Sequence, residues 1–91
     1  MESLETIKKQ IHDGLPTDAA IKLLTEYIEE NPTSDEALTL RGMRHWSNGN
    51  RACAINDYLA AIEINPESKA KLALKATNEI LDYYNKDLYN P

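Results

Sequence analysis

Cysteine, glycine and long apolar runs are all scarce in this sequence of 91 residues. The single cysteine, Cys53, excludes an internal disulfide framework, and we expect it to be a reduced thiol. A count of only three glycines argues against a disordered chain. No stretch approaches the roughly 18 apolar residues of a membrane-spanning helix, so no membrane association is expected.

The N-terminal residues Met1 to Glu5 also lack the basic segment and apolar core of an export signal. We therefore expect one small cytoplasmic domain, with an accessory domain cut from a longer exported protein as the open alternative.

Basic residues are too few and too scattered for nucleic-acid binding. Ten Lys and Arg face fifteen Asp and Glu, giving a net charge of −5. Binding to a phosphate backbone needs clustered positive charge, which this chain does not carry. No nucleic-acid partner is expected.

Residues that could support catalysis or metal binding are equally sparse. His12, His45 and Cys53 are the soft ligands available, and they form no His-x-x-x-His or Cys-x-x-Cys spacing. His12 is followed by Asp13, but adjacent residues of a helix point about 100° apart and do not face each other. The sequence has no glycine-rich phosphate loop. We expect neither an enzyme nor a cofactor or metal site.

What the sequence does contain is a repeat with a period of 34 residues. Pro32 and Pro66 have this spacing, and each closes a similar segment that begins with Ala-Ile and ends with Asn-Pro. Ser34 and Ser68 keep the same spacing, and each is suited to cap the helix that follows. Repeats of this length are typical of stacked supersecondary units that bury their apolar faces against one another.

The apolar spacing predicts five helices. The first is expected over about 4–12 and the fourth over about 51–64. The second should end before Asn31 and the third at about Ser47, and the fifth should run from about Ser68 to Tyr84 or beyond. Thr17 is a candidate N-cap, and Thr33 and Glu36 are placed as a capping box. Asn48 to Asn50 predicts a turn, because Gly and Asn both tolerate positive φ.

Seven residues of the second repeat fit a known helix-pair pattern: Leu38, Gly42, Gly49, Ala54, Tyr58, Ala61 and Pro66. This pattern resembles the tetratricopeptide (TPR) family. The resemblance implies an all-α fold, namely a right-handed α-α superhelix of two helix-turn-helix repeats, about 1–34 and 35–68. A C-terminal capping helix and tail, about 69–91, would follow. Small residues allow the paired helices to approach closely, and Tyr58 fills the space beside them.

The first repeat matches less well, at Ala20, Leu24, Tyr27 and Pro32, and Lys8 stands where the pattern has a small residue. The end of the chain, 78–91, is similar to the tail of small stand-alone bacterial TPR proteins, which suggests a bacterial protein.

The resemblance also implies a concave groove that binds a protein or peptide. Trp46 is the expected anchor, because Trp is enriched among binding hot spots, and Met43 would supply an adaptable contact beside it. The alternative is that Trp46 packs against the first repeat. The residues expected to contact a partner are Lys9, His12, Thr39, Met43, Trp46, Ala73, Thr77 and Ile80.

Some TPR domains clamp a C-terminal carboxylate with basic side chains. The matching positions here hold Glu5, Lys9, Leu40, Ala70 and Leu74. Only one of them is basic, so we do not expect this kind of recognition.

The predicted C-terminal helix has an apolar arc wider than capping alone needs. One explanation is that the tail Asp87 to Tyr89 folds back over it. The other is that Leu74, Leu81 and Tyr84 meet a partner or a second copy of the chain, which would form a homodimer.

Overall fold

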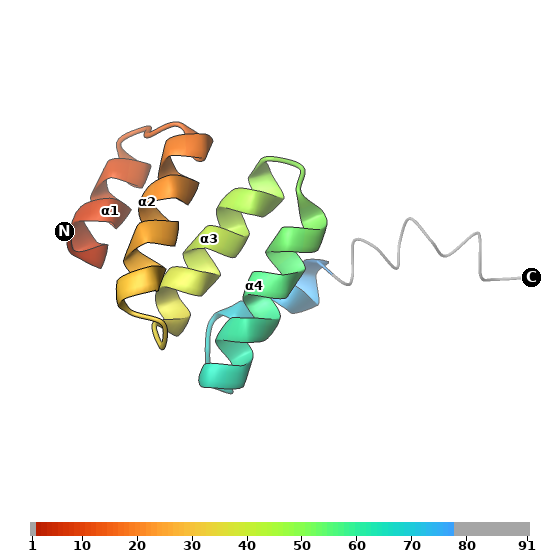
Figure 1. The fold of residues 1–91 in the computed structure, drawn as a ribbon. Coiled ribbons are helices and arrows are strands. Elements are labelled where there is room, and N and C mark those ends of the chain that lie inside the picture. Colours follow the sequence, from red (N-terminus) through yellow and green to blue (C-terminus); the bar gives the residue numbers. More distant parts are fainter. Residues whose placement is uncertain (1, 78–91) are drawn as a thin grey trace, which may run out of the picture.

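The chain folds into helices that stack in two layers (Figure 1). The computed structural model describes residues 2–77. These form α1 (Leu4–His12), α2 (Thr17–Glu30), α3 (Asp35–Ser47), α4 (Arg51–Ile64) and a further helix over 70–77. Within this range there is no strand, so the all-α expectation is confirmed for the described residues. The predicted bounds of α1 and α4 are confirmed, as are the predicted ends of α2 and α3.

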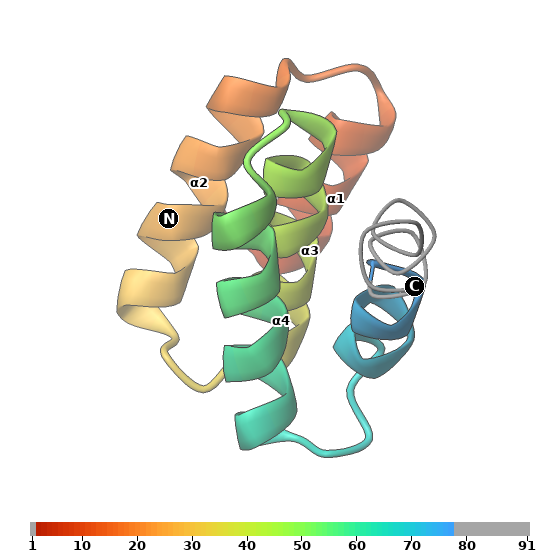
Figure 2. The ribbon, with the colours of Figure 1, turned by 90° about the vertical axis from the view of Figure 1, so that its right-hand side faces the viewer.

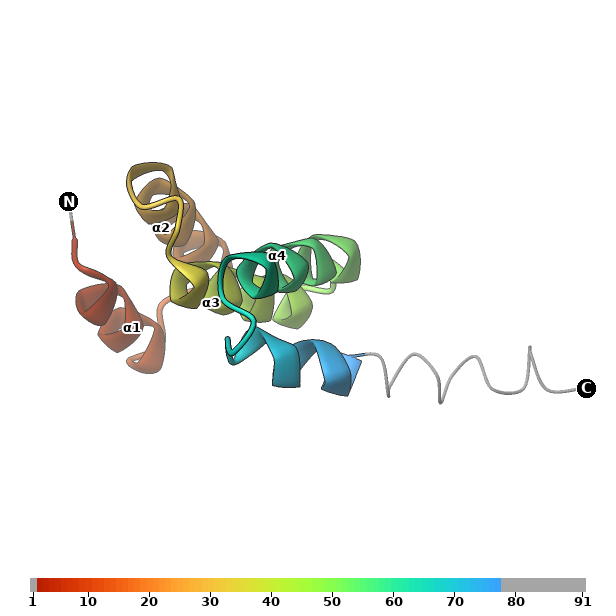
Figure 3. The same ribbon diagram turned by 90° about the horizontal axis from the view of Figure 1, so that it is seen from below.

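The two layers are clearest from below (Figure 3). One layer holds α1, α3 and the 70–77 helix, and the other holds α2 and α4. None of the helices described here is both long and apolar enough to cross a membrane.

Short polar side chains cap the N-termini of three helices. Ser3, Ser34 and Asn50 each accept a hydrogen bond from the backbone N–H three residues later, at 3.2, 3.2 and 3.4 Å. The predicted caps at Thr17 and Thr33 are wrong. Thr17 is the first residue of α2 and follows Pro16, which supplies no side-chain cap.

The capping box fails because its glutamate is used elsewhere. Glu36 accepts a hydrogen bond from Lys8 of α1 at 2.6 Å, while Ser34, one residue after Thr33, caps the helix.

The turn between α3 and α4 is built as the sequence predicts. Gly49 has φ of 82°, a conformation that glycine adopts without steric cost. Beyond this turn the two helices cross closely at Gly42, which is buried against the ring of Tyr58 and the carbonyl oxygen of Ala54. The predicted approach of Gly42 to Ala54 is therefore confirmed.

Two apolar clusters form the core. The first joins α1, α2 and α3 through Leu4, Ile7, Leu24 and Ala37. The second joins α3, α4 and the 70–77 helix through Leu38, Ala54, Tyr58, Ala61 and Ala70. Ile28 of α2 packs against both clusters and links them.

A buried ion pair crosses the core beside these clusters. Arg41 of α3 donates two hydrogen bonds of 2.8 Å to the carboxylate of Asp57 on α4, which is only 6% exposed. Arg41 also donates to Thr25 of α2 at 3.3 Å, and His45 lies 3.9 Å from Asp57. The hydrogen bonds to Asp57 raise the pKa of Arg41. Three helices are thus tied together by one guanidinium group.

Candidate functional site

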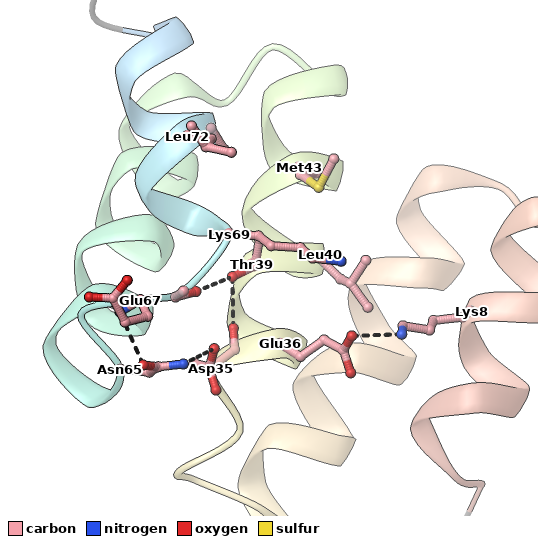
Figure 4. Close-up of a pocket in the computed structure, with 12 residues that line it drawn as sticks. Lys8, Asp35, Glu36, Thr39, Leu40, Met43, Asn65, Glu67, Lys69 and Leu72 are labelled. Carbon is pink, nitrogen blue, oxygen red and sulfur yellow. Dashed lines mark hydrogen bonds and ion pairs between the residues drawn. The ribbon is translucent and has the colours of Figure 1, made fainter.

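A groove opens on the layer that contains α1, α3 and the 70–77 helix (Figure 4). Its volume is about 690 Å³. We call it the α3 groove, because α3 supplies its floor. The lining residues are Lys8 of α1; Asp35, Glu36, Thr39, Leu40 and Met43 of α3; and Asn65, Glu67, Ser68, Lys69, Leu72 and Ala73 from the segment that follows α4.

Apolar side chains occupy the middle of the α3 groove. Met43 projects from α3 and is 42% exposed, and Leu72 projects from the 70–77 helix and is 73% exposed (Figure 4). Leu40, one helical turn before Met43 on α3, continues the apolar surface toward α1. Met43 and Leu72 therefore face an open space, whereas Leu40 also packs against the cluster of α1, α2 and α3.

Charged side chains gather at one end of the groove. Lys8 bridges α1 to α3 through its 2.6 Å contact with Glu36 and lies 3.4 Å from Glu5. The hydrogen bond to Glu36 raises the pKa of Lys8 above its usual value. At this end the groove presents paired charges of both signs instead of the positive clamp that a free carboxylate would need.

Hydrogen bonds hold the segment after α4 against the start of α3. Asn65 donates to the carboxylate of Asp35 at 3.4 Å, and the hydroxyl groups of Thr39 and Ser68 lie 3.3 Å apart. Thr39 also donates to the backbone oxygen of Asp35 at 2.8 Å. These contacts position the 70–77 helix, and with it Leu72, opposite Met43.

A smaller hollow of about 230 Å³ continues from the groove along α3. Met43 and Ala73 line both the α3 groove and the smaller hollow, so these two spaces join into one trough. Trp46 and Tyr58 lie at the far end of this trough. Burial raises the pKa of the Tyr58 hydroxyl, so it remains neutral and uncharged at physiological pH.

Trp46 borders the trough and also takes part in the packing between helices. It lines the smaller hollow, yet it is half-buried and packs against the cluster shared by α3, α4 and the 70–77 helix. The guanidinium of Arg51 lies 5.1 Å from the centre of its ring, within the range of a cation–π interaction. Its packing is thus with the second repeat rather than with the first.

Of the other residues predicted to contact a partner, some line the trough and others lie away from it. Met43 and Ala73 line the trough. Thr39 and Thr77 also border it but are buried, with their hydroxyl groups bonded to backbone oxygens one turn earlier. Lys9 and His12 are exposed on α1 and line neither space.

Of the residues predicted for self-association, Leu74 is partly buried against the α3–α4 cluster. Ile80, Leu81 and Tyr84 lie outside the described residues.

Lys8 and Leu72 shape the groove but were not predicted to do so from the sequence. Lys8 was noted only as a departure from the TPR pattern, although it spans the space between α1 and α3. Leu72 belonged to the wide apolar arc of the last helix, and a helical wheel alone could not show which part of that arc faces the groove.

No metal-binding arrangement is found in residues 2–77, since no three His, Cys, Asp or Glu side chains converge there. The sequence matches no protein-family model, and neither the curated proteins nor the solved structures contain a match to it.

Proposed function

We propose that this chain is a non-catalytic, TPR-like protein-interaction module that binds a peptide or a protein segment in the α3 groove. Its right-handed superhelical class and cytoplasmic location are part of the same proposal. The observation that carries it is an open trough whose apolar walls, Met43 and Leu72, come from two different helices. A monomer rarely leaves such neighbouring apolar side chains facing an open space unless they serve in binding.

Two further features support the TPR-like assignment. Successive helices pair and stack in two layers, and the pair α3–α4 crosses where Gly42 lies against Tyr58. In a stack of this kind, the first helix of each pair lines one face of the molecule. Here α1, α3 and the 70–77 helix form that face, and the trough lies on it.

The groove favours a segment with apolar side chains spaced to meet Leu40, Met43 and Leu72. Burying one such side chain contributes about 1.5–3 kcal/mol, which corresponds to roughly ten- to a hundredfold in affinity. The charged end of the groove is already internally paired through Lys8 and Glu36, so it contributes less to affinity than the apolar centre.

A random peptide library selected against the full chain tests this proposal. Peptides enriched on the wild-type protein should bind at least about tenfold more weakly to Met43→Glu and to Leu72→Glu. Leu59→Glu is the matched control, because Leu59 is 51% exposed on α4 and does not line the groove. Titration calorimetry with the selected peptides measures the three affinities.

The proposal fails if no peptide is enriched. It also fails if the enriched peptides bind Met43→Glu and Leu72→Glu as tightly as the wild type. Circular dichroism of each variant checks that helicity is retained, so that a loss of binding can be attributed to the changed groove residue.

A further inference from the structure

The end of the stack opposite α1 carries apolar side chains that no described helix covers. Figure 2 looks onto this end, with α4 and the 70–77 helix in front. Ile55, Leu59 and Ile62 of α4 follow one another at spacings of four and three, so they share one face of the helix. Leu59 is 51% exposed, and the two isoleucines are half-buried.

The buried face of α4 is a different one. Ala54, Tyr58 and Ala61 point into the core, and Asp57 points toward Arg41. Apolar side chains therefore continue around α4 well beyond the face that its own chain buries. A helix that is apolar on several faces is normally covered on each of them.

The 70–77 helix extends this apolar surface. Leu74 packs against the same cluster as Ile62 and is only partly buried. We call Ile55, Leu59, Ile62 and Leu74 together the stack-end face. It is separate from the α3 groove, because none of these four residues lines the groove.

Charged residues border the stack-end face on both helices. Arg51, one turn before Ile55 on α4, lies over the ring of Trp46, and the charges nearer the connection between the two helices have opposite signs. Glu63 is exposed on α4, one turn after Leu59, and Lys71 and Lys75 are exposed on the 70–77 helix beside Leu74. None of these three residues forms an ion pair with another residue of 2–77. The 70–77 helix follows α4 after a short segment, so Glu63 and Lys71 both lie near the connection between the two helices, and Lys75 lies one turn further along.

We propose that a second copy of this chain covers the stack-end face. A two-fold axis running along the helices would place α4 of each copy against the 70–77 helix of the other. Leu59 then packs beside Leu74 of the second copy, and Glu63 faces Lys71 and Lys75. A two-fold interface repeats every contact, so one face with both charges is complementary to itself.

The charge pattern also argues for a second copy over an unrelated chain. Glu63 and Lys71 belong to the same surface and both lie near the connection between α4 and the 70–77 helix. When the two-fold axis places an identical surface against it, the acidic residue of each copy meets the basic residues of the other. This interaction is independent of peptide binding in the α3 groove.

Sedimentation equilibrium of the full chain over a range of concentrations tests the proposal. The wild type should shift from monomer to dimer as its concentration rises. Leu59→Glu should weaken the dimer roughly tenfold or more, because it places a charge in the apolar centre. Leu72→Glu is the matched control: it changes a leucine that is even more exposed, but on the groove side, and should leave the dimer unchanged.

A charge exchange distinguishes this interface from any other dimer. Glu63→Lys makes both borders basic, and Lys71→Glu combined with Lys75→Glu makes both borders acidic. Each variant alone should dimerise more weakly than the wild type, and an equal mixture of the two should form a heterodimer at wild-type strength.

Three results would overturn the proposal. They are a monomer at every concentration, a dimer lost on Leu72→Glu but kept on Leu59→Glu, and a mixture of charge variants that associates no better than either alone.

Discussion

Adding a single methyl group at Gly42 should destabilise this protein, although alanine is the better helix former. An ideal Cβ at this position would lie 2.6 Å from Cε1 and 2.8 Å from Cδ1 of Tyr58. It would also lie 3.2 Å from the carbonyl oxygen of Ala54. The ring of Tyr58 is buried, and the carbonyl belongs to the backbone of α4, so neither can move without separating α3 from α4.

The net effect of Gly42→Ala is the difference between two terms. Helix propensity favours alanine over glycine by about 1 kcal/mol in a helix interior. Overpacking a close-packed crossing costs about 1–3 kcal/mol, and the contacts under 3.0 Å put this site at the upper end of that range. We therefore expect a net loss of about 1–2 kcal/mol, and a larger loss for Gly42→Leu.

Urea unfolding followed by circular dichroism measures this loss, and thermal melting should show a decrease of roughly 4–8 °C per kcal/mol for a domain of this size. The double variant Gly42→Ala with Tyr58→Leu provides the control, because a smaller residue at 58 removes the ring that the methyl group meets. The two changes should be coupled, with the pair less destabilising than the sum of the single changes. An unchanged or raised melting temperature for Gly42→Ala would refute the close crossing.

Three other measurements address the core and the trough. Asp57→Ala should lower the free energy of unfolding in urea by about 2–3 kcal/mol, because it leaves the half-buried guanidinium of Arg41 without its two carboxylate bonds. Glu36→Ala, at the exposed Lys8–Glu36 pair, should cost far less, and equal losses for the two variants would contradict this ranking. The fluorescence of Trp46 should be partly quenched by acrylamide, and Arg51→Ala should increase that quenching by uncovering the ring; no increase would argue against the stacked pair. The pKa of Tyr58 should lie above about 10, its unfolded value, so its contribution to folding is complete below that pH and is lost as the pH rises through the higher folded value. The difference in tyrosinate absorbance between the wild type and Tyr58→Phe gives this pKa directly, and a midpoint at or below 10 would contradict burial of the hydroxyl.

Local signals in the sequence were sufficient to locate the helices. The bounds of 4–12 and 51–64 follow from the apolar spacing together with the breaks at Gly14 and at Asn65-Pro66. Both kinds of signal act within a few residues, so they need no tertiary context. The close crossing at Gly42 was instead expected from the resemblance to the TPR pattern, in which small residues lie where paired helices cross.

The capping errors show where local reasoning stops. Thr33 and Glu36 have the spacing of a capping box, but Glu36 bonds to Lys8, which is 28 residues away in the chain. Ser34 is the N-cap of α3, so Glu36 lies two residues after the cap instead of three, and its carboxylate bonds to α1. Local reasoning also stops at Arg41 and Asp57, whose pairing across 16 residues left no recognisable pattern in the sequence.

By itself, the sequence determined the helical class, the 34-residue repeat and the positions of the turns. Only the tertiary structure decided how each helix is rotated about its own axis. That rotation directs Lys8 instead of Lys9 toward α3, Leu72 into the groove and Leu74 toward the core. The physical reason is that successive residues of a helix are turned by about 100°, so a small rotation changes which side chain faces a neighbour. Packing of all the helices at once sets that rotation, and no single segment contains the information.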